Sequence, residues 1–357
     1  MTTSIYKVIA LMSGTSLDGV DIICVTFSYN GIWSYEILNA ETLNYSKDWK
    51  KTLSQLIGRS REELITIDNV YSDYLSSLVQ GFIAKHKIVN IDFVASHGHT
   101  ALHQPQNGLT LQIGNQQVFS DLLNQKVICD FRIQDVELGG QGAPLVPIGD
   151  RLLFSDYDFC LNLGGFANIS FEENNNRLAF DICPVNIVLN HYVSKLGLDY
   201  DDRGQLASKG IINVELLYRL NSLEFYNEKP PKSLGLEWVD KEIFPLIDEF
   251  QLSEKAILRT FVEHVVIQIL KIVKQSNSKV LVTGGGVYNE FLISRLNELS
   301  TTQIILPNRE LIEFKEALIF GLLGVLKDRN EVNSLSSVTG ATKDHSSGKI
   351  LIPNSKN

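Results

Sequence analysis

The sequence predicts an α/β fold with mixed sheets, divided between two domains. Short apolar runs that are typical of buried strands alternate with longer helical patterns, and this alternation is typical of the α/β class. At 357 residues the chain exceeds the roughly 250–300 residues at which one hydrophobic core stops growing, so two domains with a cleft between them are expected. A strand, glycine turn and strand over residues 5–27 has a counterpart at 159–171, which indicates two halves of similar organisation.

The first half is expected to combine short strands with one long helical segment. Apolar residues recur at helical spacing from Trp49 to Lys87, whereas the neighbouring apolar runs are short. The expected elements are strands at 5–11, 20–27, 93–95 and 127–130, helices at 49–87 and up to about 123, and a polar loop at 96–105, with the segment 109–114 left unassigned. Glycine and proline are dense from Gly139 to Pro147, so we place the domain transition within about 131–148.

The second half continues the alternation of strands and helices. Its expected elements are the hairpin at 159–171, strands at 177–180 and 279–282, helices at 187–197, 210–221, 253–275, 290–299 and 312–326, and a polar tail from Lys327 onward. We therefore predict an N-terminal domain at 1–132 and a C-terminal domain at 133–328. The tail of about 329–357 is expected to pack back on the first domain.

Composition and charge indicate a protein that binds a small molecule. The net charge is −9, from 32 Lys+Arg against 41 Asp+Glu, which argues against a nucleic-acid or anionic-membrane surface. No apolar run approaches the ~20 residues of a membrane span, and the N-terminus does not resemble a secretory signal. The four cysteines are far apart and form no zinc or disulfide pattern. We expect a cytoplasmic protein without nucleic-acid or membrane partners.

Three glycine turns that follow strands are candidates for nucleotide binding. They are Gly14 to Gly19, Gly164-Gly165 and Gly284-Gly285-Gly286. Glycine lets backbone N–H groups approach phosphate oxygens, and Thr15 or Ser16 could add hydroxyl donors, although glycine often serves the turn alone. None of the three is a P-loop or a dinucleotide-binding motif. Their repetition in a two-domain chain favours a nucleotide.

Asp181 is the candidate catalytic base. It follows the apolar run Arg177 to Phe180, and ligands of open α/β sheets lie beyond the carboxyl ends of strands. An Asp shortly before a proline, here Pro184, can equally be a turn former. The residues alone leave both interpretations open.

Histidines and single charged residues supply further candidates. His97 and His99 follow an expected strand, and they could hydrogen-bond a substrate, bind a metal or be ordinary loop residues. Arg132 could bind a carboxylate or phosphate, or form a surface ion pair. Glu316 lies near the expected start of the late helix, as a helix N-terminal carboxylate or a substrate contact. Lys232-Ser233 after Pro230-Pro231 is interpreted as a structural loop.

Motifs along most of the chain match one family. The matching blocks are Met12–Asp21, Ser96–Thr100, Leu111–Gly114, Asp130–Arg132, Gly139–Pro147, Leu161–Gly165, Pro230–Ser233 and Gly284–Gly286. Together they resemble anhydro-N-acetylmuramic acid kinase over about residues 8–342. The resemblance implies the actin-like ATPase fold, a duplicated ribonuclease H-like unit, and usually a homodimer. It also implies ATP and Mg²⁺, and conversion of 1,6-anhydro-N-acetylmuramic acid and water to N-acetylmuramic acid 6-phosphate during cell-wall recycling.

The resemblance also assigns roles to residues. It makes Asp181 the catalytic base, and it brings His97, Thr100, Arg132 and Glu316 near the sugar. The residues that it assigns to ATP are Gly14, Thr15, Ser16, Leu17, Asp18, Gly19, Val20 and Asp21 in the first hairpin, Gly164 and Gly165 in the second, and Gly284, Gly285 and Gly286 on the adenosine side. It assigns no protein metal ligand.

Two departures from the family pattern bear on activity. After the Asp the family usually has Thr-Gly-Pro-Gly-Asn, but this chain has Ile182-Cys183-Pro184-Val185-Asn186, so the side chains of Cys183 and Val185 could narrow the site. His99 stands where the family commonly has glutamine. An active kinase is the leading hypothesis. The alternatives are a catalytically impaired, nucleotide-dependent sugar-binding regulator and, more weakly, a metal hydrolase using His97 and His99.

Overall fold

The computed structural model describes residues 3–14, 17–274 and 276–354, which form two compact units. Unit 1 comprises Met1–Leu153 and Phe314–Asn357, and unit 2 comprises Phe154–Glu313. The chain thus enters unit 2 after Leu153, beyond the expected boundary at 132, and returns at Phe314, before the expected boundary at 328. The tail after residue 328 belongs to unit 1.

Unit 1 is built on a six-stranded sheet with the order β13-β7-β4-β1-β2-β3. Strands β1, β2 and β3 are antiparallel neighbours, β4 and β7 add in parallel to β1, and β13 pairs antiparallel with β7. The strands are β1 (Ser4–Ser13), β2 (Gly19–Tyr29), β3 (Trp33–Asn44), β4 (Phe93–Ser96), β7 (Val127–Cys129) and β13 (Lys349–Leu351). A separate hairpin pairs β5 (His99–Gln104) with β6 (Leu109–Ile113).

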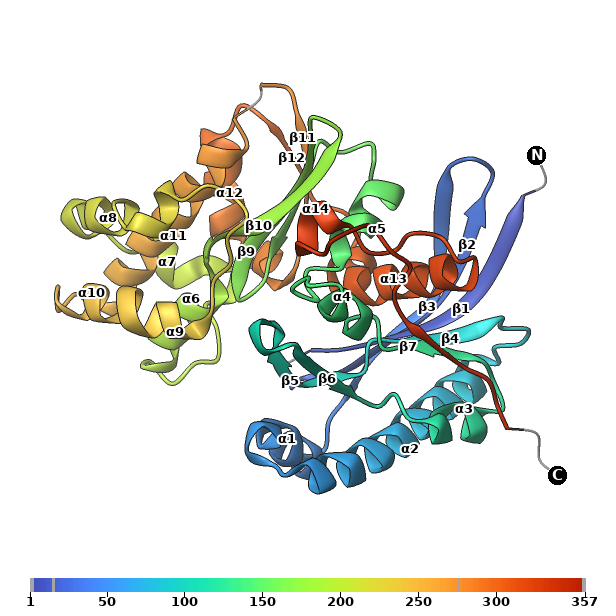
Figure 1. Ribbon diagram of the computed structural model, residues 1–357. Coiled ribbons are helices and arrows are strands. Elements are labelled where there is room, and N and C mark those ends of the chain that lie inside the picture. Colours follow the sequence, from blue (N-terminus) through green and yellow to red (C-terminus); the bar gives the residue numbers. More distant parts are fainter. Residues whose placement is uncertain (1–2, 15–16, 275, 355–357) are drawn as a thin grey trace. The chain divides into compact units, whose positions relative to one another are not determined.

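Two long helices pack on opposite faces of this sheet (Figure 1). Helix α2 (Arg61–His86) packs its buried residues against Ile9, Leu11 and Val94. Helix α13 (Arg309–Asp328) approaches β1 and β4 through glycines, because a Cβ at Gly321 would stand 3.1 Å from the Ala10 Cβ. The remaining helices of unit 1 are α1 (Lys47–Ser54), η1 (Leu56–Gly58), η2 (Pro105–Asn107), α3 (Gln117–Leu123), α4 (Ile133–Glu137), α5 (Val146–Leu153) and α14 (Ser336–Thr339).

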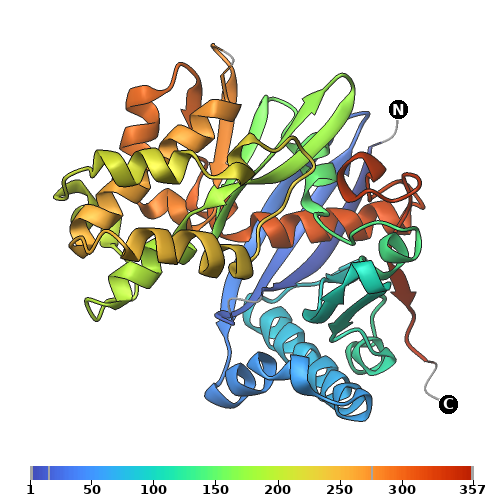
Figure 2. The same cartoon turned by 60° about the vertical axis from the view of Figure 1, so that its left-hand side comes forward.

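Unit 2 contains a five-stranded sheet with the order β10-β9-β8-β11-β12. Its strands are β8 (Phe159–Leu163), β9 (Phe166–Glu173), β10 (Asn176–Pro184), β11 (Lys279–Thr283) and β12 (Gln303–Ile305). Helices α6 and α11 pack on this sheet (Figure 2), and their buried apolar residues share one core cluster with it. The helices are α6 (Asn186–Ser194), η3 (Asp202–Gly204), α7 (Gln205–Ser208), α8 (Val214–Asn221), η4 (Glu224–Asn227), α9 (Leu236–Trp238), η5 (Val239–Ile243), α10 (Phe244–Asp248), α11 (Glu254–Ile272), η6 (Gly285–Tyr288) and α12 (Glu290–Leu299).

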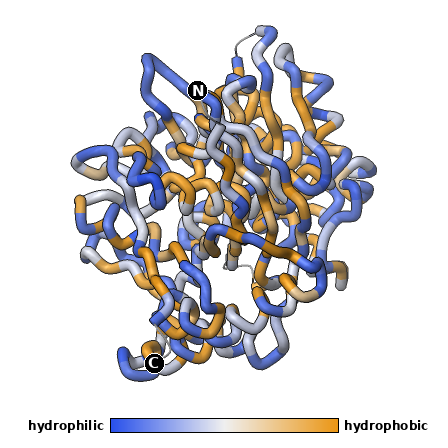
Figure 3. The backbone as a smooth tube through the Cα atoms, turned by 90° about the vertical axis from the view of Figure 1, so that its right-hand side faces the viewer, coloured by the Kyte–Doolittle hydropathy of each residue, from blue (hydrophilic) through white to orange (hydrophobic). Residues whose placement is uncertain are grey.

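The two sheets share one strand order. In each, three consecutive antiparallel strands are followed by two strands that add in parallel beside the first: β3-β2-β1-β4-β7 and β10-β9-β8-β11-β12. The hairpins predicted at 5–27 and 159–171 are the first two strands of these sheets. The prediction of an α/β fold with mixed sheets and two similar halves is therefore confirmed. The strands are predominantly hydrophobic and many connecting loops hydrophilic (Figure 3).

The prediction and the structure differ at several elements, three of which lie in the first half of the chain. Strand β3 was not predicted, because this edge strand alternates between half-buried and exposed residues and lacks an apolar run. The polar loop predicted at 96–105 contains strand β5, whose partner β6 satisfies its backbone. The single helix predicted at 49–87 is broken, since Ser60 and Glu63 form a capping box that starts α2. Among the described residues, no helix is long and apolar enough to cross a membrane.

Candidate active site

Asp181 lies inside strand β10. The sequence-based prediction that it follows the end of its strand is wrong. The strand continues to Pro184, and its pairing with β9 shifts register between Asp181 and Cys183. Such a bulge redirects side chains without ending the strand. Asp181 is half-buried, whereas Phe180 and Ile182 on either side are buried in the core of unit 2. At the bulge, the strand thus keeps its apolar neighbours in the core while the Asp181 side chain is partly exposed.

One carboxylate oxygen of Asp181 is fixed by the backbone. The Leu234 N–H donates to Oδ2 at 2.8 Å, and the Asp181 N–H donates to the Lys232 carbonyl at 3.1 Å. Within the described part of the chain, Oδ1 accepts no hydrogen bond. Burial raises the pKa of the Asp181 carboxyl, and the Leu234 N–H opposes this shift. Asp181 is thus oriented through one oxygen and can accept a proton on the other.

The segment Pro230–Ser233, interpreted from sequence as a structural loop, is the partner of Asp181. Lys232 supplies the carbonyl that receives the Asp181 N–H, and its ammonium donates to the Phe225 carbonyl at 2.8 Å. The ammonium also lies 4.3 Å from the centre of the Phe225 ring. These contacts hold the loop beside the bulge. A proline pair gives no sequence signal for this role, because the two segments are far apart in the chain.

Cys183 and Val185 pack in the core of unit 2. Both side chains are 0% exposed and belong to the same cluster as Val188 and Leu189 of α6. The Val185 N–H donates to the Gly165 carbonyl at 2.8 Å. The core therefore accommodates the two side chains that replace family glycines. Because both are fully buried, they do not narrow the surface beside Asp181.

The second and third glycine turns meet at the end of β8. A Cβ at Gly284, whose φ is +87°, would stand 2.5 Å from Asn162 Oδ1, and one at Gly286 would stand 2.7 Å from the Leu163 Cβ. Close packing therefore explains these two glycines. At Gly165 and Gly285, both exposed, the nearest atom to a Cβ would be 4.0 Å away. The open surface at these two positions leaves room for a ligand close to the backbone.

The first glycine hairpin is only partly described, and Thr15 and Ser16 lie outside the described residues. Gly14 accepts a hydrogen bond from the Leu17 N–H at 3.4 Å, and Leu17 has a φ of 59°. A Cβ at Gly19 would stand 2.5 Å from the Leu43 carbonyl oxygen, so β3 explains this glycine. Val20 is buried and Asp18 is exposed. The Asp21 carboxylate accepts from the Thr42 hydroxyl of β3 at 2.6 Å.

His97 and Arg132 form a defined pair in unit 1. Arg132 Nε donates to His97 Nε2 at 2.9 Å, so Nε2 is an acceptor and the ring proton belongs on Nδ1. Nδ1 lies 2.9 Å from the Gly98 carbonyl and donates to it. Burial, together with the Arg132 charge, lowers the pKa of His97 well below its usual range. His97 is therefore neutral, and both ring nitrogens are engaged by protein groups.

Arg132 is held at a second point. Its Nη1 donates to the Gly142 carbonyl at 2.6 Å. Burial lowers the pKa of Arg132 to about 10, and the carboxylates of Glu316 and Asp135 oppose this shift. The side chain thus stays charged at neutral pH. Within the described residues, Nη2 donates no hydrogen bond to the protein, so part of the guanidinium is available to a ligand.

Glu316 and Thr100 lie at half-buried or exposed positions of unit 1. Thr100 is half-buried on β5, opposite Gln112. Glu316 is exposed and lies inside α13, which begins at Arg309 and not near Ile312 as predicted. The alternative in which Glu316 is a helix N-terminal carboxylate is therefore wrong. Its charge acts on Arg132, which joins His97, Arg132 and Glu316 in one electrostatic group.

His99 belongs to a buried polar network that the sequence did not reveal. Its Nδ1 lies 2.9 Å from the Ser13 hydroxyl, which also contacts the hydroxyls of Tyr45 and Tyr71. Burial lowers the pKa of His99 to about 4. The two tyrosines come from segments that sequence periodicity assigns to a helix and its flank. Across the described residues, no group of three or more His, Cys, Asp and Glu side chains could hold a metal ion.

Comparison with known proteins identifies the family. A family model described as anhydro-N-acetylmuramic acid kinase matches residues 6–353. The chain belongs to this family. A protein named anhydro-N-acetylmuramic acid kinase from Clostridioides difficile is 34% identical over 93% of this chain and 95% of its own length. Proteins of the same name from Zymomonas mobilis and Haemophilus influenzae are each 31% identical over 96% of this chain, and over 98% and 97% of their own lengths.

Membership of the anhydro-N-acetylmuramic acid kinase family confirms the resemblance drawn from the sequence motifs. The match extends beyond the motif blocks at both ends, from residue 6 to residue 353. The prediction of an enzyme of this kinase family is confirmed, and the regulatory alternative has no support among these relatives.

Proposed function

We propose that this chain uses ATP and Mg²⁺ to open the anhydro ring of 1,6-anhydro-N-acetylmuramic acid with water and to phosphorylate O6. The product is N-acetylmuramic acid 6-phosphate, formed during cell-wall recycling. The observation that carries the proposal is the full-length family match together with Asp181, a carboxylate fixed through Oδ2 and open at Oδ1. Family membership supports the substrate, and the local geometry supports the chemistry.

Asp181 is the general base of this proposal. Its Oδ1 takes a proton from water, the oxygen of that water bonds to the anomeric carbon, and the bond from that carbon to the bridging oxygen breaks. The bridging oxygen stays on C6 and attacks the γ-phosphorus of ATP, which releases ADP. Burial raises the pKa of Asp181, which makes its carboxylate a stronger base and so supports this role.

Arg132 is the cationic sugar-binding residue of the proposal. Its free N–H groups suit the carboxylate of a muramic acid, because a guanidinium matches a carboxylate in both charge and geometry. Thr100 and Glu316 are proposed to contact the sugar beside it. His97, by contrast, has both ring nitrogens engaged, so we propose that it serves the sugar by orienting Arg132.

The glycine turns fit an ATP-binding role. Gly165 and Gly285 leave open space beside the backbone, and Gly164 adjoins them at the end of β8. Phosphates approach glycine backbones at such turns. Mg²⁺, which takes oxygen ligands and usually a carboxylate beside the phosphates, would neutralise phosphate charge. We propose that the exposed carboxylate of Asp18, in the first hairpin, lies near this Mg²⁺. We further propose a cytoplasmic homodimer without nucleic-acid partners.

A product assay tests this function. The purified chain is incubated with ATP, Mg²⁺ and 1,6-anhydro-N-acetylmuramic acid, and ADP and sugar phosphate are measured. We expect equal amounts of both, and no turnover with N-acetylmuramic acid, which lacks the anhydro ring. ATP binding without sugar phosphate would instead indicate the impaired regulator. Hydrolysis that needs zinc and no ATP would indicate the metal hydrolase.

A further inference from the structure

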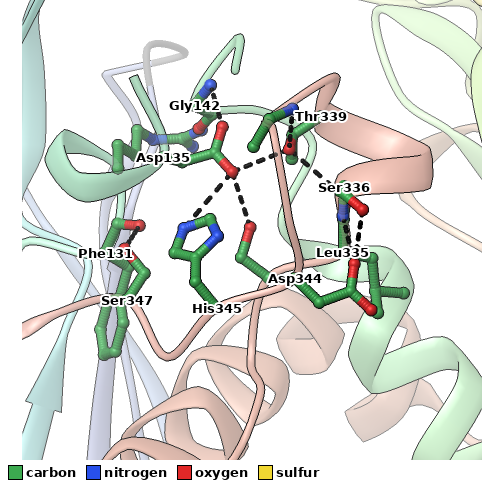
Figure 4. Close-up of polar contacts among 12 residues, drawn as sticks. Phe131, Asp135, Gly142, Leu335, Ser336, Thr339, Asp344, His345 and Ser347 are labelled. Carbon is green, nitrogen blue, oxygen red and sulfur yellow. Dashed lines mark hydrogen bonds and ion pairs between the residues drawn. The ribbon is translucent and has the colours of Figure 1, made fainter. Parts of the chain in front are cut away.

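A buried carboxylate joins the C-terminal segment to the glycine-rich loop of unit 1. Asp135 of α4 is 0% exposed, and its Oδ1 accepts from the Ser334 hydroxyl at 2.9 Å and from the Thr339 hydroxyl at 2.7 Å. His345 Nε2 lies 3.5 Å from the same oxygen (Figure 4). Oδ2 accepts from the Gly142 N–H at 2.8 Å. Asp135 thus bridges segments that are about 200 residues apart, as the 204-residue separation from Thr339 illustrates.

The glycine held by Asp135 is the glycine that holds Arg132. The Gly142 N–H donates to Asp135, and the Gly142 carbonyl accepts from Arg132 Nη1 at 2.6 Å. Gly142 has a φ of +68°, and a Cβ there would stand 2.9 Å from Val136 Cγ2. The peptide groups on both sides of Gly142 are therefore tightly placed. A displacement of its N–H would also displace the carbonyl that orients the guanidinium.

The buried carboxylate of Asp135 needs hydrogen-bond partners in the protein. Burying a carboxyl group is unfavourable unless protein hydrogen bonds replace those that it makes to water. Three donors and a nearby imidazole do so here. At Gly140, an added Cβ would collide with Asp135 Oδ2, so the loop closes tightly around the acid. Two of the three donors and the imidazole come from residues 334–345, so this segment supplies most of the partners of the buried acid.

We propose that Asp135 is a positioning residue through which the C-terminal segment 334–345 sets the geometry of Arg132 for binding the sugar. The chain of contacts runs from Thr339 and Ser334 to Asp135, then through Gly142 to Arg132. His97 holds the other side of the guanidinium. Asp135 does not touch the substrate. Its effect on sugar binding rests on the proposed function, but its effect on Arg132 does not.

Nuclear magnetic resonance of the full chain tests the positioning of Arg132 without any substrate. With ¹⁵N-labelled arginine, the Arg132 Nε–H should exchange slowly with water in the wild type, because His97 accepts from it. Asp135→Asn and Thr339→Val should each speed this exchange by roughly 10-fold, as expected for loss of a charge-assisted hydrogen bond. Thr339→Ser, which keeps the hydroxyl, should leave the exchange unchanged. Exchange that stays slow in both disruptive variants would overturn the proposal.

Kinetics then separate positioning from general loss of stability. Thr339→Val should raise the KM for the anhydro-sugar about 5- to 10-fold while the KM for ATP and the fold measured by circular dichroism remain unchanged. Thr339→Ser should restore the sugar KM. Equal increases of both KM values, or a lower melting temperature with neither KM changed, would overturn the proposal. A wild type that phosphorylates no sugar would refute the proposed function alone, since the exchange experiment would still report on Asp135.

Discussion

The two sheets of this protein have the same strand order but use their polar side chains differently. In unit 1, protein groups engage both ring nitrogens of His97 and fix Arg132 at Nε and Nη1, and Asp135 and His99 are buried. In unit 2, Asp181 is fixed through one oxygen at a strand bulge, and its other oxygen accepts no hydrogen bond from the described residues. Unit 1 therefore orients a cation rigidly, whereas unit 2 keeps a carboxylate available for proton transfer.

The largest loss of activity should follow from replacing Asp181, whose Oδ1 is free of hydrogen bonds from the described residues of unit 2. Asp181→Asn keeps the acceptor for the Leu234 N–H but removes the base, so kcat should fall by about 10²–10⁴-fold. ATP binding, measured by calorimetry, should remain. Asp158→Asn is the matched control, because the Asp158 carboxylate also receives a backbone N–H, that of Lys279, but is exposed. A turnover equal to wild type in Asp181→Asn would remove this residue from the base role.

A smaller loss of activity should follow from replacing Arg132, the positioned cation of unit 1. Arg132→Lys retains the charge but cannot donate to both His97 and Gly142 with a fork geometry. Hydrogen bonds to charged groups contribute ~1.5–3 kcal/mol, so the sugar KM should rise roughly 10- to 100-fold with the ATP KM unchanged. Steady-state kinetics measure this. Arg59→Lys, at the exposed ion pair with Glu63, should change neither constant. An unchanged sugar KM in Arg132→Lys would contradict the claim that unit 1 orients this guanidinium to bind the sugar.

The core beside Asp181 should govern stability and not catalysis. Cys183→Gly restores the family residue but removes a side chain that is 0% exposed, so the free energy of unfolding should fall by roughly 2 kcal/mol. Denaturant titration measures the loss, and Cys183→Ala separates lost volume from added backbone freedom. Turnover of the folded variant should match wild type. A several-fold gain in turnover at unchanged stability would show that Cys183 does narrow the site.

The smallest effect concerns the buried histidine of unit 1. The pKa of His99 is about 4 in the folded state and ~6.5 in the unfolded chain, so the unfolded state takes up the proton first as pH falls. Stability is therefore lost between these two values, by about 1 kcal/mol from pH 7 to 5.5. His99→Gln, which installs the family residue, should abolish this part of the pH dependence in thermal unfolding. An identical pH dependence in the variant would exclude His99 as its source.

The sequence predicted the repeated fold better than it predicted the site. Apolar runs and glycine turns predict most strands of both sheets, because burial determines those patterns directly. Strand β3 escaped prediction, since its half-exposed residues depend on pairing with β2. Motif resemblance singled out Asp181 and Arg132. The strand bulge, the partner loop at Lys232 and the role of Asp135 depend on contacts between distant segments, and no local pattern encodes them.

The pH dependence of kcat/KM for the anhydro-sugar tests the central claim, that Asp181 is the general base, most directly. A base must be ionised, and burial raises the pKa of Asp181, so the rate should fall as pH decreases through a single ionisation above the ordinary value of ~3.9. The residual activity of Asp181→Asn should lack that acid limb. An acid limb that is the same in wild type and Asp181→Asn would contradict the assignment.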